Sequence, residues 1–183
     1  MIETVDHIII VVEDLHSAEE NYTKILGLKP VWRGAHDALG TSNVLFNFEN
    51  TYLELLSATG SGIGADLVKQ TIKEKGDSLL GLVLGTKDIN SFREIIEKSG
   101  HSLSELSDGE GKNEQNEQRE WLLQFLPNEL TRGIFSFVIE HKSEGLPLFT
   151  KDKSTVSRLE QVVVKTRDIN GFINVYRVNV VGC

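Results

Sequence analysis

Cysteine is almost absent from this 183-residue chain, and its one copy, Cys183, is the last residue. A disulfide framework and a thiolate metal cluster are therefore excluded. An end residue also lacks the fixed neighbours that lower a thiol pKa, which makes Cys183 a poor nucleophile. No apolar run approaches the length of a membrane span, and the first residues carry neither a basic region nor a signal-like apolar core. We therefore expect a cytoplasmic location and no membrane partner.

Positive charge is also in short supply. Lys and Arg number 19 against 27 Asp and Glu, which leaves a formal net charge of −8. Binding to phosphate needs a concentrated positive surface, so this balance argues against a nucleic-acid partner. About half of the negative excess lies within residues 101–120, which we interpret as a solvated hairpin loop. The hydrophobic content of 39% suffices for one domain, or for one domain built from two similar halves.

A unit made of an apolar strand, a helix cap and a helix recurs three times. The first copy spans residues 6–28, the second starts at residue 79 and the third at residue 159. The helix-capping aspartates align the copies: Asp14, Asp88 and Asp168. That alignment places three different residues at one strand position: His7, Gly81 and Gln161. The chain is therefore a supersecondary unit that repeats.

Two paired strands, 41–48 and 51–58, are predicted after the first helix, with a turn at residues 49–50. A two-residue turn sets Asn47 opposite Tyr52 and Leu45 opposite Glu54. One face of this hairpin is wholly apolar and must lie under the helix. The other face looks away from the helix and carries the polar side chains: Asn43, Asn47, Tyr52 and Glu54.

The chain divides into two modules, two linkers and an incomplete third unit. These are 1–58 (first module), 59–77 (linker with a short helix), 78–141 (second module), 142–157 (linker) and 158–183 (partial third βα repeat). In the second module we expect strands at 79–86, near 101–106, at 121–126 and at 134–141. By parity along the last of these strands, Glu140 takes the place that Glu54 has in the first module.

This arrangement resembles the vicinal oxygen chelate superfamily and, more closely, its glyoxalase-like branch. The resemblance covers residues 1–141 well, and 158–183 as a partial extra repeat. The motifs that carry it are Asp6-His7, Val12-Glu13-Asp14-Leu15, Gly40-Thr41-Ser42-Asn43, Thr51-Tyr52-Leu53-Glu54-Leu55 and Phe137-Val138-Ile139-Glu140-His141. It implies an α+β fold in which paired βαβββ modules form a half-open mixed β-barrel with helices outside, plus the truncated third unit.

The resemblance also implies one divalent metal ion inside the barrel. By position, His7, Glu54 and Glu140 fall at three ligand places and Gly81 at the fourth. One imidazole and two carboxylates would suit Zn²⁺, Mn²⁺, Fe²⁺ or Ni²⁺. Two carboxylates in one partly apolar barrel also need a cation or protons between them. Glycine cannot coordinate through a side chain, so the fourth place leaves room for substrate oxygens or marks a site that has stopped binding metal.

Five further residues are candidates for binding a small oxygenated substrate. They are His36, Asn43, Asn47, Tyr52 and Arg33, the last as a partner for an anionic group. Turn capping and strand-end hydrogen bonds are the alternative for His36 and Asn43, and a surface strand position is the alternative for Arg33.

Three functions are compatible with these residues. The first is a metal-dependent enzyme that chelates vicinal oxygens of a small carbonyl or enol substrate, with isomerase, lyase or dioxygenase chemistry and Glu140 or Glu54 moving the proton. The second is a metal-free protein that binds or sequesters a small molecule in the same barrel. The third is an inactive truncated paralogue, which would be marginally stable or would depend on a homodimer to cover the sheet edge at residues 159–166.

Overall fold

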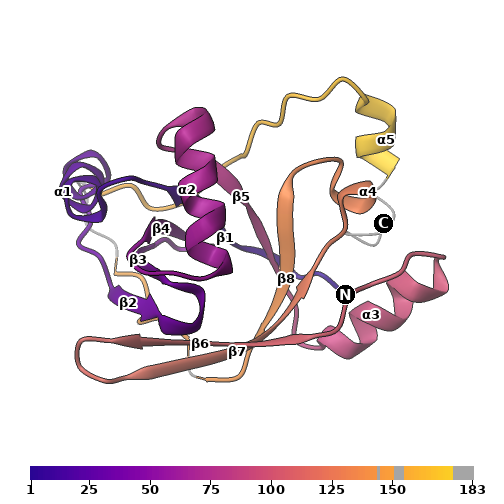
Figure 1. Cartoon of the computed structure of the whole chain (residues 1–183), viewed down its shortest axis with the longest axis horizontal. Coiled ribbons are helices and arrows are strands. Elements are labelled where there is room, and N and C mark those ends of the chain that lie inside the picture. The colour runs from indigo at the N-terminus through magenta and orange to yellow at the C-terminus, as the bar shows by residue number, and fades with distance from the viewer. Residues whose placement is uncertain (144, 151–154, 175–183) are drawn as a thin grey trace.

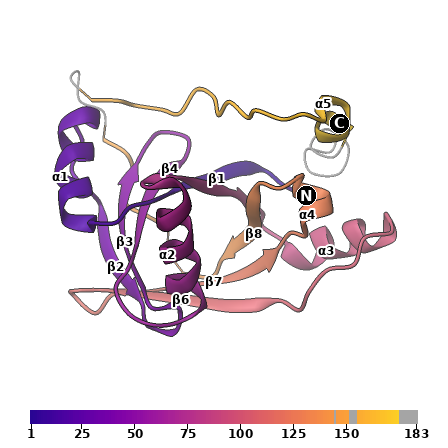
Figure 2. The ribbon, with the colours of Figure 1, turned by 45° about the horizontal axis from the view of Figure 1, so that its top comes forward.

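Eight strands form one closed barrel in the computed structural model, which describes residues 1–143, 145–150 and 155–174 (Figures 1 and 2). The strands are β1 (Thr4–Val11), β2 (Trp32–His36), β3 (Thr41–Asn47), β4 (Tyr52–Ala58), β5 (Ser78–Gly85), β6 (Ser107–Asn113), β7 (Gln118–Phe125) and β8 (Phe135–His141). The helices are α1 (Leu15–Leu26), the 3-10 turn η1 (Asp37–Leu39), α2 (Ile63–Lys75), α3 (Ile89–Lys98), α4 (Asn128–Thr131) and α5 (Ile169–Asn174). In this part of the chain no helix is long and apolar enough to cross a membrane.

The barrel order is β1-β4-β3-β2-β6-β7-β8-β5, which joins two βαβββ modules edge to edge. Within the modules, β1 pairs in parallel with β4, and β5 pairs in parallel with β8. Between them, β1 pairs antiparallel with β5, and β2 pairs with β6. The paired modules with outer helices are as expected, but the barrel is closed rather than half-open because Gly34 and Ala35 pair with Asn113 and Lys112.

The predicted helix caps are confirmed. The Asp14 side chain accepts a hydrogen bond from the Ser17 N–H at 2.9 Å, and the Asp88 side chain accepts one from the Ser91 N–H at 2.9 Å. In the third copy, Asp168 likewise precedes α5. The strand expected at residues 159–166 is not formed, although its residues are described. The described part of the third copy thus has its cap and a short helix but adds no strand to the sheet.

Separate apolar cores lie outside and inside the barrel. The apolar face of β3 and β4 packs under α1, and Val138 of β8 packs with Phe92 of α3. The strand pairing of β3 and β4 matches the prediction, with Leu45 opposite Glu54. The polar face of that hairpin therefore lines the interior, where it meets the smaller apolar cluster around Ile9.

Residues 101–106, expected as a strand, form none, and much of the stretch 101–120, interpreted as a solvated loop, belongs instead to the β6–β7 hairpin. Figures 1 and 2 show it running from the α3 end of the barrel to β2. Acidic side chains such as Asp108 and Glu110 are exposed on β6, while Gly109 and Gly111 face inward. A side chain at Gly109 would collide with Trp121. The glycines therefore make room for an interior tryptophan instead of marking a loop.

Candidate functional site

An irregularity in β1 turns two consecutive side chains toward each other. The pairing of β1 with β5 shifts between Val5 and His7, so that Asp6 lies in a β-bulge. Bulges re-aim side chains in this way. Asp6 Oδ1 lies 2.7 Å from His7 Nδ1, although neighbouring residues of a regular strand point to opposite faces. The aspartate of the predicted Asp6-His7 motif thus becomes part of the barrel interior.

His7 is buried between two carboxylates. Its Nε2 lies 3.3 Å from Glu54 Oε2, on the far side of the ring from Asp6. Burial alone would lower the pKa of His7, but the hydrogen bonds to Asp6 and Glu54 raise it above its usual value. Burial would likewise raise the pKa of Glu54, but the hydrogen bond and charge of His7 lower it. The arrangement therefore favours the imidazolium form of His7 and the ionised forms of the two carboxylates beside it.

Asn43 and His36 extend this cluster along β3 and β2. Asn43 Nδ2 donates to Glu54 Oε1 at 2.7 Å and lies 3.4 Å from His36 Nε2. His36 Nδ1 is 3.0 Å from the Thr41 hydroxyl. Burial lowers the pKa of His36, so this second imidazole is held neutral. The structure thus places Asn43 against Glu54 and His36 beside Asn43; both residues were predicted to bind substrate.

His141 completes a chain of hydrogen bonds from the other module. Its Nε2 lies 3.0 Å from Asp6 Oδ2, and its Nδ1 is buried with no hydrogen-bond partner among the described residues. Hydrogen bonds from His141 and His7 hold the pKa of Asp6 well below its usual range, against the effect of burial. The result is a continuous chain from Glu54 through His7 and Asp6 to His141.

A cavity of about 320 Å³ opens beside Asp6 and His141, at the end of this chain of hydrogen bonds. It lies between the start of β1, the β3–β4 turn and residues 145–149, which run across it. Asp6, Tyr52, Arg119 and His141 supply its titratable walls on the barrel side. This volume is at the lower end of the range for small-molecule sites.

Arg119 of β7 is the residue that sequence reasoning missed most clearly. It is only 8% exposed, and its guanidinium carbon lies 5.6 Å from the Trp32 ring centroid and 5.9 Å from that of Tyr52. Tyr52 in turn stacks on His7 with centroids 4.4 Å apart. The available signal was that Arg119 is one of only two basic residues in the acidic stretch 101–120.

The prediction that Glu140 faces the interior is wrong. Glu140 Oε2 accepts a hydrogen bond from the Ile89 N–H at 2.9 Å, and its other oxygen pairs with Lys142. Phe137 and Ile139 face the interior instead, and Phe137 lies edge-on to His7. Glu140 therefore caps α3 on the outside of the barrel, and the structure does not bring it to His7 and Glu54.

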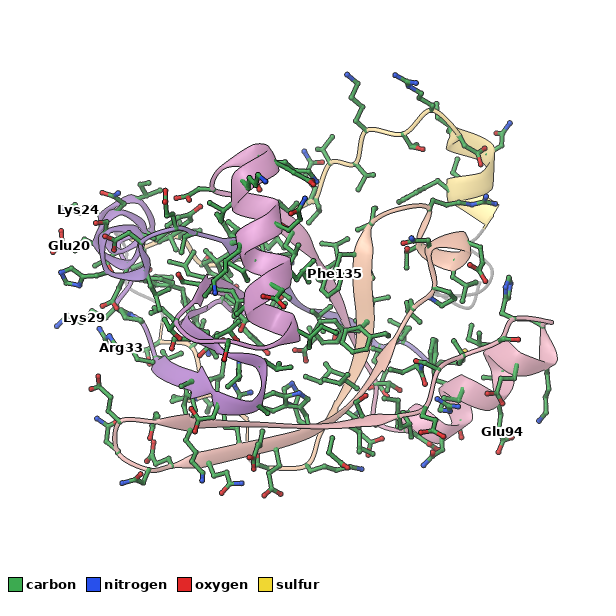
Figure 3. The ribbon with its side chains drawn as sticks, in the orientation of Figure 1. Glu20, Lys24, Lys29, Arg33, Glu94 and Phe135 are labelled. Carbon is green, nitrogen blue, oxygen red and sulfur yellow. The ribbon has the colours of Figure 1, made fainter. Side chains whose placement is uncertain are left out.

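The other predicted residues divide between the cavity and the surface. Asn47 lines the cavity, and its Nδ2 donates to the Pro147 carbonyl at 2.5 Å, which ties β3 to the crossing segment. Tyr52 lines it as well. Arg33 lies on the outer flank, where it pairs with Glu19 of α1 (Figure 3). Arg33 is therefore a surface strand residue, and it does not line the cavity.

The ligand places carried over from the resemblance do not assemble a metal site. In the described part of the chain, no three His, Cys, Asp or Glu side chains are grouped so that they could hold an ion. His7 and Glu54 lie together but contact each other directly, and Glu140 points away. A side chain at Gly81 would collide with the Phe135 carbonyl oxygen. These residues therefore do not fit a protein-bound divalent ion.

Divalent ions are accordingly expected to leave the melting temperature unchanged. A ligand at 100 times its dissociation constant stabilises the folded state by about 2.7 kcal/mol. For a chain of this size that is a rise in Tm of roughly 5–10 °C. Differential scanning fluorimetry with Zn²⁺, Mn²⁺, Fe²⁺ and Ni²⁺ measures it. A rise of that size that disappears in a His7→Ala variant would contradict the expectation.

Comparisons with known proteins agree on one fold. A family model described as a glyoxalase-like domain matches residues 5–177. No curated protein sequence matches the chain. Among solved structures, a variant of Streptomyces coelicolor methylmalonyl-CoA epimerase in complex with 2-nitronate-propionyl-CoA is 18% identical with a TM-score of 0.61, over 78% of this chain and 100% of that one. Methylmalonyl-CoA epimerase from Mycobacterium tuberculosis is 19% identical with a TM-score of 0.61, over 76% and 88%. A hypothetical protein from Bacillus halodurans is 18% identical with a TM-score of 0.62, over 79% and 98%.

Proposed function

Because the chain belongs to the glyoxalase-like domain family of the vicinal oxygen chelate superfamily, we propose that it is an isomerase-type enzyme that moves a proton within a small carbonyl compound. The observation that carries this proposal is the chain of hydrogen-bonded groups that ends at the cavity: Glu54, His7, Asp6 and His141. The epimerases of the same fold support it, since epimerisation requires a proton to leave a carbon and return.

His141 is the proton carrier in this proposal. Asp6 accepts the Nε2–H of His141, which leaves Nδ1 as the free nitrogen of the neutral ring. Nδ1 takes the proton from the carbon next to the substrate carbonyl, and the C–H electron pair moves onto the carbonyl oxygen to give an enolate. Return of that proton to the same carbon restores the carbonyl group and regenerates neutral His141. The step is balanced without an oxidant or reductant.

The inner residues position and tune this carrier. Asp6 must stay ionised to stabilise the imidazolium of His141, and the His7 imidazolium keeps it so. Glu54 holds His7 from behind, and Asn43 holds Glu54. Glu54, predicted as a catalytic residue, acts here as a positioning residue through His7. No step is routed through a divalent ion, because the donor set does not fit one.

Replacing His141 with Ala should slow proton exchange by about 10²- to 10⁴-fold, the usual contribution of a general base. The measurement is loss of the C–H signals of dihydroxyacetone and pyruvate in D₂O, followed by NMR with the wild-type chain and the variant. His16→Ala on the exposed face of α1 is the matched control and should exchange like the wild type. Wild-type exchange no faster than buffer, or equal rates in both variants, would overturn the proposal.

A metal-free binding protein is the second candidate, and one observation favours it. Glu54 and His7 are buried behind Tyr52 and do not line the cavity, so they can stabilise the folded barrel without taking part in a reaction. Calorimetry separates the two candidates. If dihydroxyacetone or pyruvate binds to the wild-type chain but its C–H protons do not exchange, the chain is a binding protein.

A further inference from the structure

Arg119 is a buried cation for which the described part of the chain supplies no counter-charge. No hydrogen bond or ion pair of its guanidinium is found within residues 1–143, 145–150 and 155–174, and Nε is buried without a partner. The nearby carboxylates are engaged elsewhere, since Asp6 binds two imidazoles and Glu54 binds His7 and Asn43. A buried charge without a partner is strongly unfavourable unless a ligand completes it.

The surroundings hold the guanidinium in place. The Trp32 and Tyr52 rings contact it, and Gly111 stands beside it across the β6–β7 pair. Rings stacked on a guanidinium fix its plane while leaving its N–H groups free to bind. Because Arg119 also lines the 320 Å³ cavity, a molecule bound there meets this cation.

We propose that Arg119 binds the carboxylate of the substrate, which makes the ligand a small carboxylic acid with a carbonyl group. The planar guanidinium matches a carboxylate with two parallel hydrogen bonds. Phosphate is the other anion that a guanidinium binds, and the titration below separates it from a carboxylate. The reaction assigned to this ligand rests on the proposed function, but carboxylate binding does not.

The positions of Arg119 and His141 suit such a molecule. Trp121 of β7 pairs with His141 of β8, and Arg119 lies two residues from Trp121 on the same face. Diagonal neighbours of this kind are about 7–8 Å apart. A ligand with its carboxylate on Arg119 and its acidic carbon one or two bonds away therefore reaches the proton carrier.

Calorimetric titration with pyruvate and malonate tests the proposal. Arg119→Gln should weaken both carboxylates by about 10- to 100-fold, as expected for charge-assisted hydrogen bonds, and Arg119→Lys should weaken them less. Arg33→Gln makes the same charge change on the outer flank and should bind like the wild type. Pyruvamide, malonamide and inorganic phosphate should bind no better to the wild type than to Arg119→Gln. Equal carboxylate affinity in wild type and Arg119→Gln, amide binding as tight as carboxylate binding, or no carboxylate binding at all would overturn it.

A second measurement uses the wild-type chain and does not depend on the folding of a variant. Phenylglyoxal modification, mapped by mass spectrometry, should slow at Arg119 when malonate is added and stay unchanged at Arg33. Equal protection at both sites, or at neither, contradicts the proposal. His141→Ala should keep its carboxylate affinity, so that lost exchange with retained binding separates a failure of the proposed reaction from a failure of this inference.

Discussion

Replacing Asp6 with Asn should lower the free energy of unfolding by about 3–5 kcal/mol, the usual cost of removing one member of a buried ion pair. The carboxylate of Asp6 serves both His7 and His141, at 2.7 and 3.0 Å. Its loss leaves two imidazoles of the interior without their common partner. Proton exchange should fall by about 10²- to 10⁴-fold in the same variant, because His141 loses the group that stabilises its charged form.

Urea unfolding at two pH values gives this prediction a sharper form. The cost should be larger at pH 6 than at pH 8.5, because the pKa of His7 is raised above its usual value and its ring no longer needs a counter-charge once the pH has risen through that value. Asp108→Asn on the exposed edge of β6 is the matched control and should change stability by less than about 0.5 kcal/mol. An Asp6→Asn variant as stable as that control would show that the two imidazoles do not depend on Asp6.

The first half of the site could be predicted from sequence because its information is local. Strict alternation along residues 41–58 fixes the pairing of β3 with β4, and the turn length sets the register. That register alone brings Asn43 and Glu54 to one face, and the repeated unit brings His7 to the same side. The repeating unit followed in the same way from the spacing of the repeats and their aspartate caps, whereas the barrel was implied by the resemblance to the vicinal oxygen chelate superfamily.

The second half could not be predicted, because β8 carries apolar residues on both faces. Phe137 and Ile139 line the interior while Val138 packs under α3, so the pattern of period two does not tell inside from outside. The prediction assigned the inward-facing residues of β8 one position away from the observed ones. Glu140 therefore lies against α3, and His141 lines the cavity. The bulge at Asp6 leaves no mark in a single sequence either.

Long-range assembly accounts for what remained hidden. Asp6 and His141 are 135 residues apart, and they meet only because β1, β5 and β8 are neighbours in the closed barrel. Arg119 lay within a run of charges and glycines that is typical of a loop. Its burial depends on Trp32 and Tyr52, which come from the other module. Sequence periodicity reports on one element at a time, whereas this cavity is made where the two modules join.

The contribution of Asp6, His7 and Glu54 to the stability of the folded chain should be largest between about pH 4.5 and pH 6.5, the ordinary values for a glutamate and a histidine. The folded-state pKa of His7 is raised, so its stabilisation is complete below pH 6.5 and is lost as the pH rises through the folded value. The pKa values of Asp6 and Glu54 are lowered, so their stabilisation is complete above pH 4.5 and is lost on acidification. Each unit by which a pKa is shifted corresponds to about 1.4 kcal/mol.

Urea unfolding from pH 3 to pH 9 measures the curve, and Glu54→Gln should move its alkaline fall to lower pH, because the raised pKa of His7 depends on that carboxylate. A wild-type curve that is flat from pH 6 to pH 9, or an alkaline fall that Glu54→Gln leaves in place, would mean that His7 does not carry its proton between these two carboxylates.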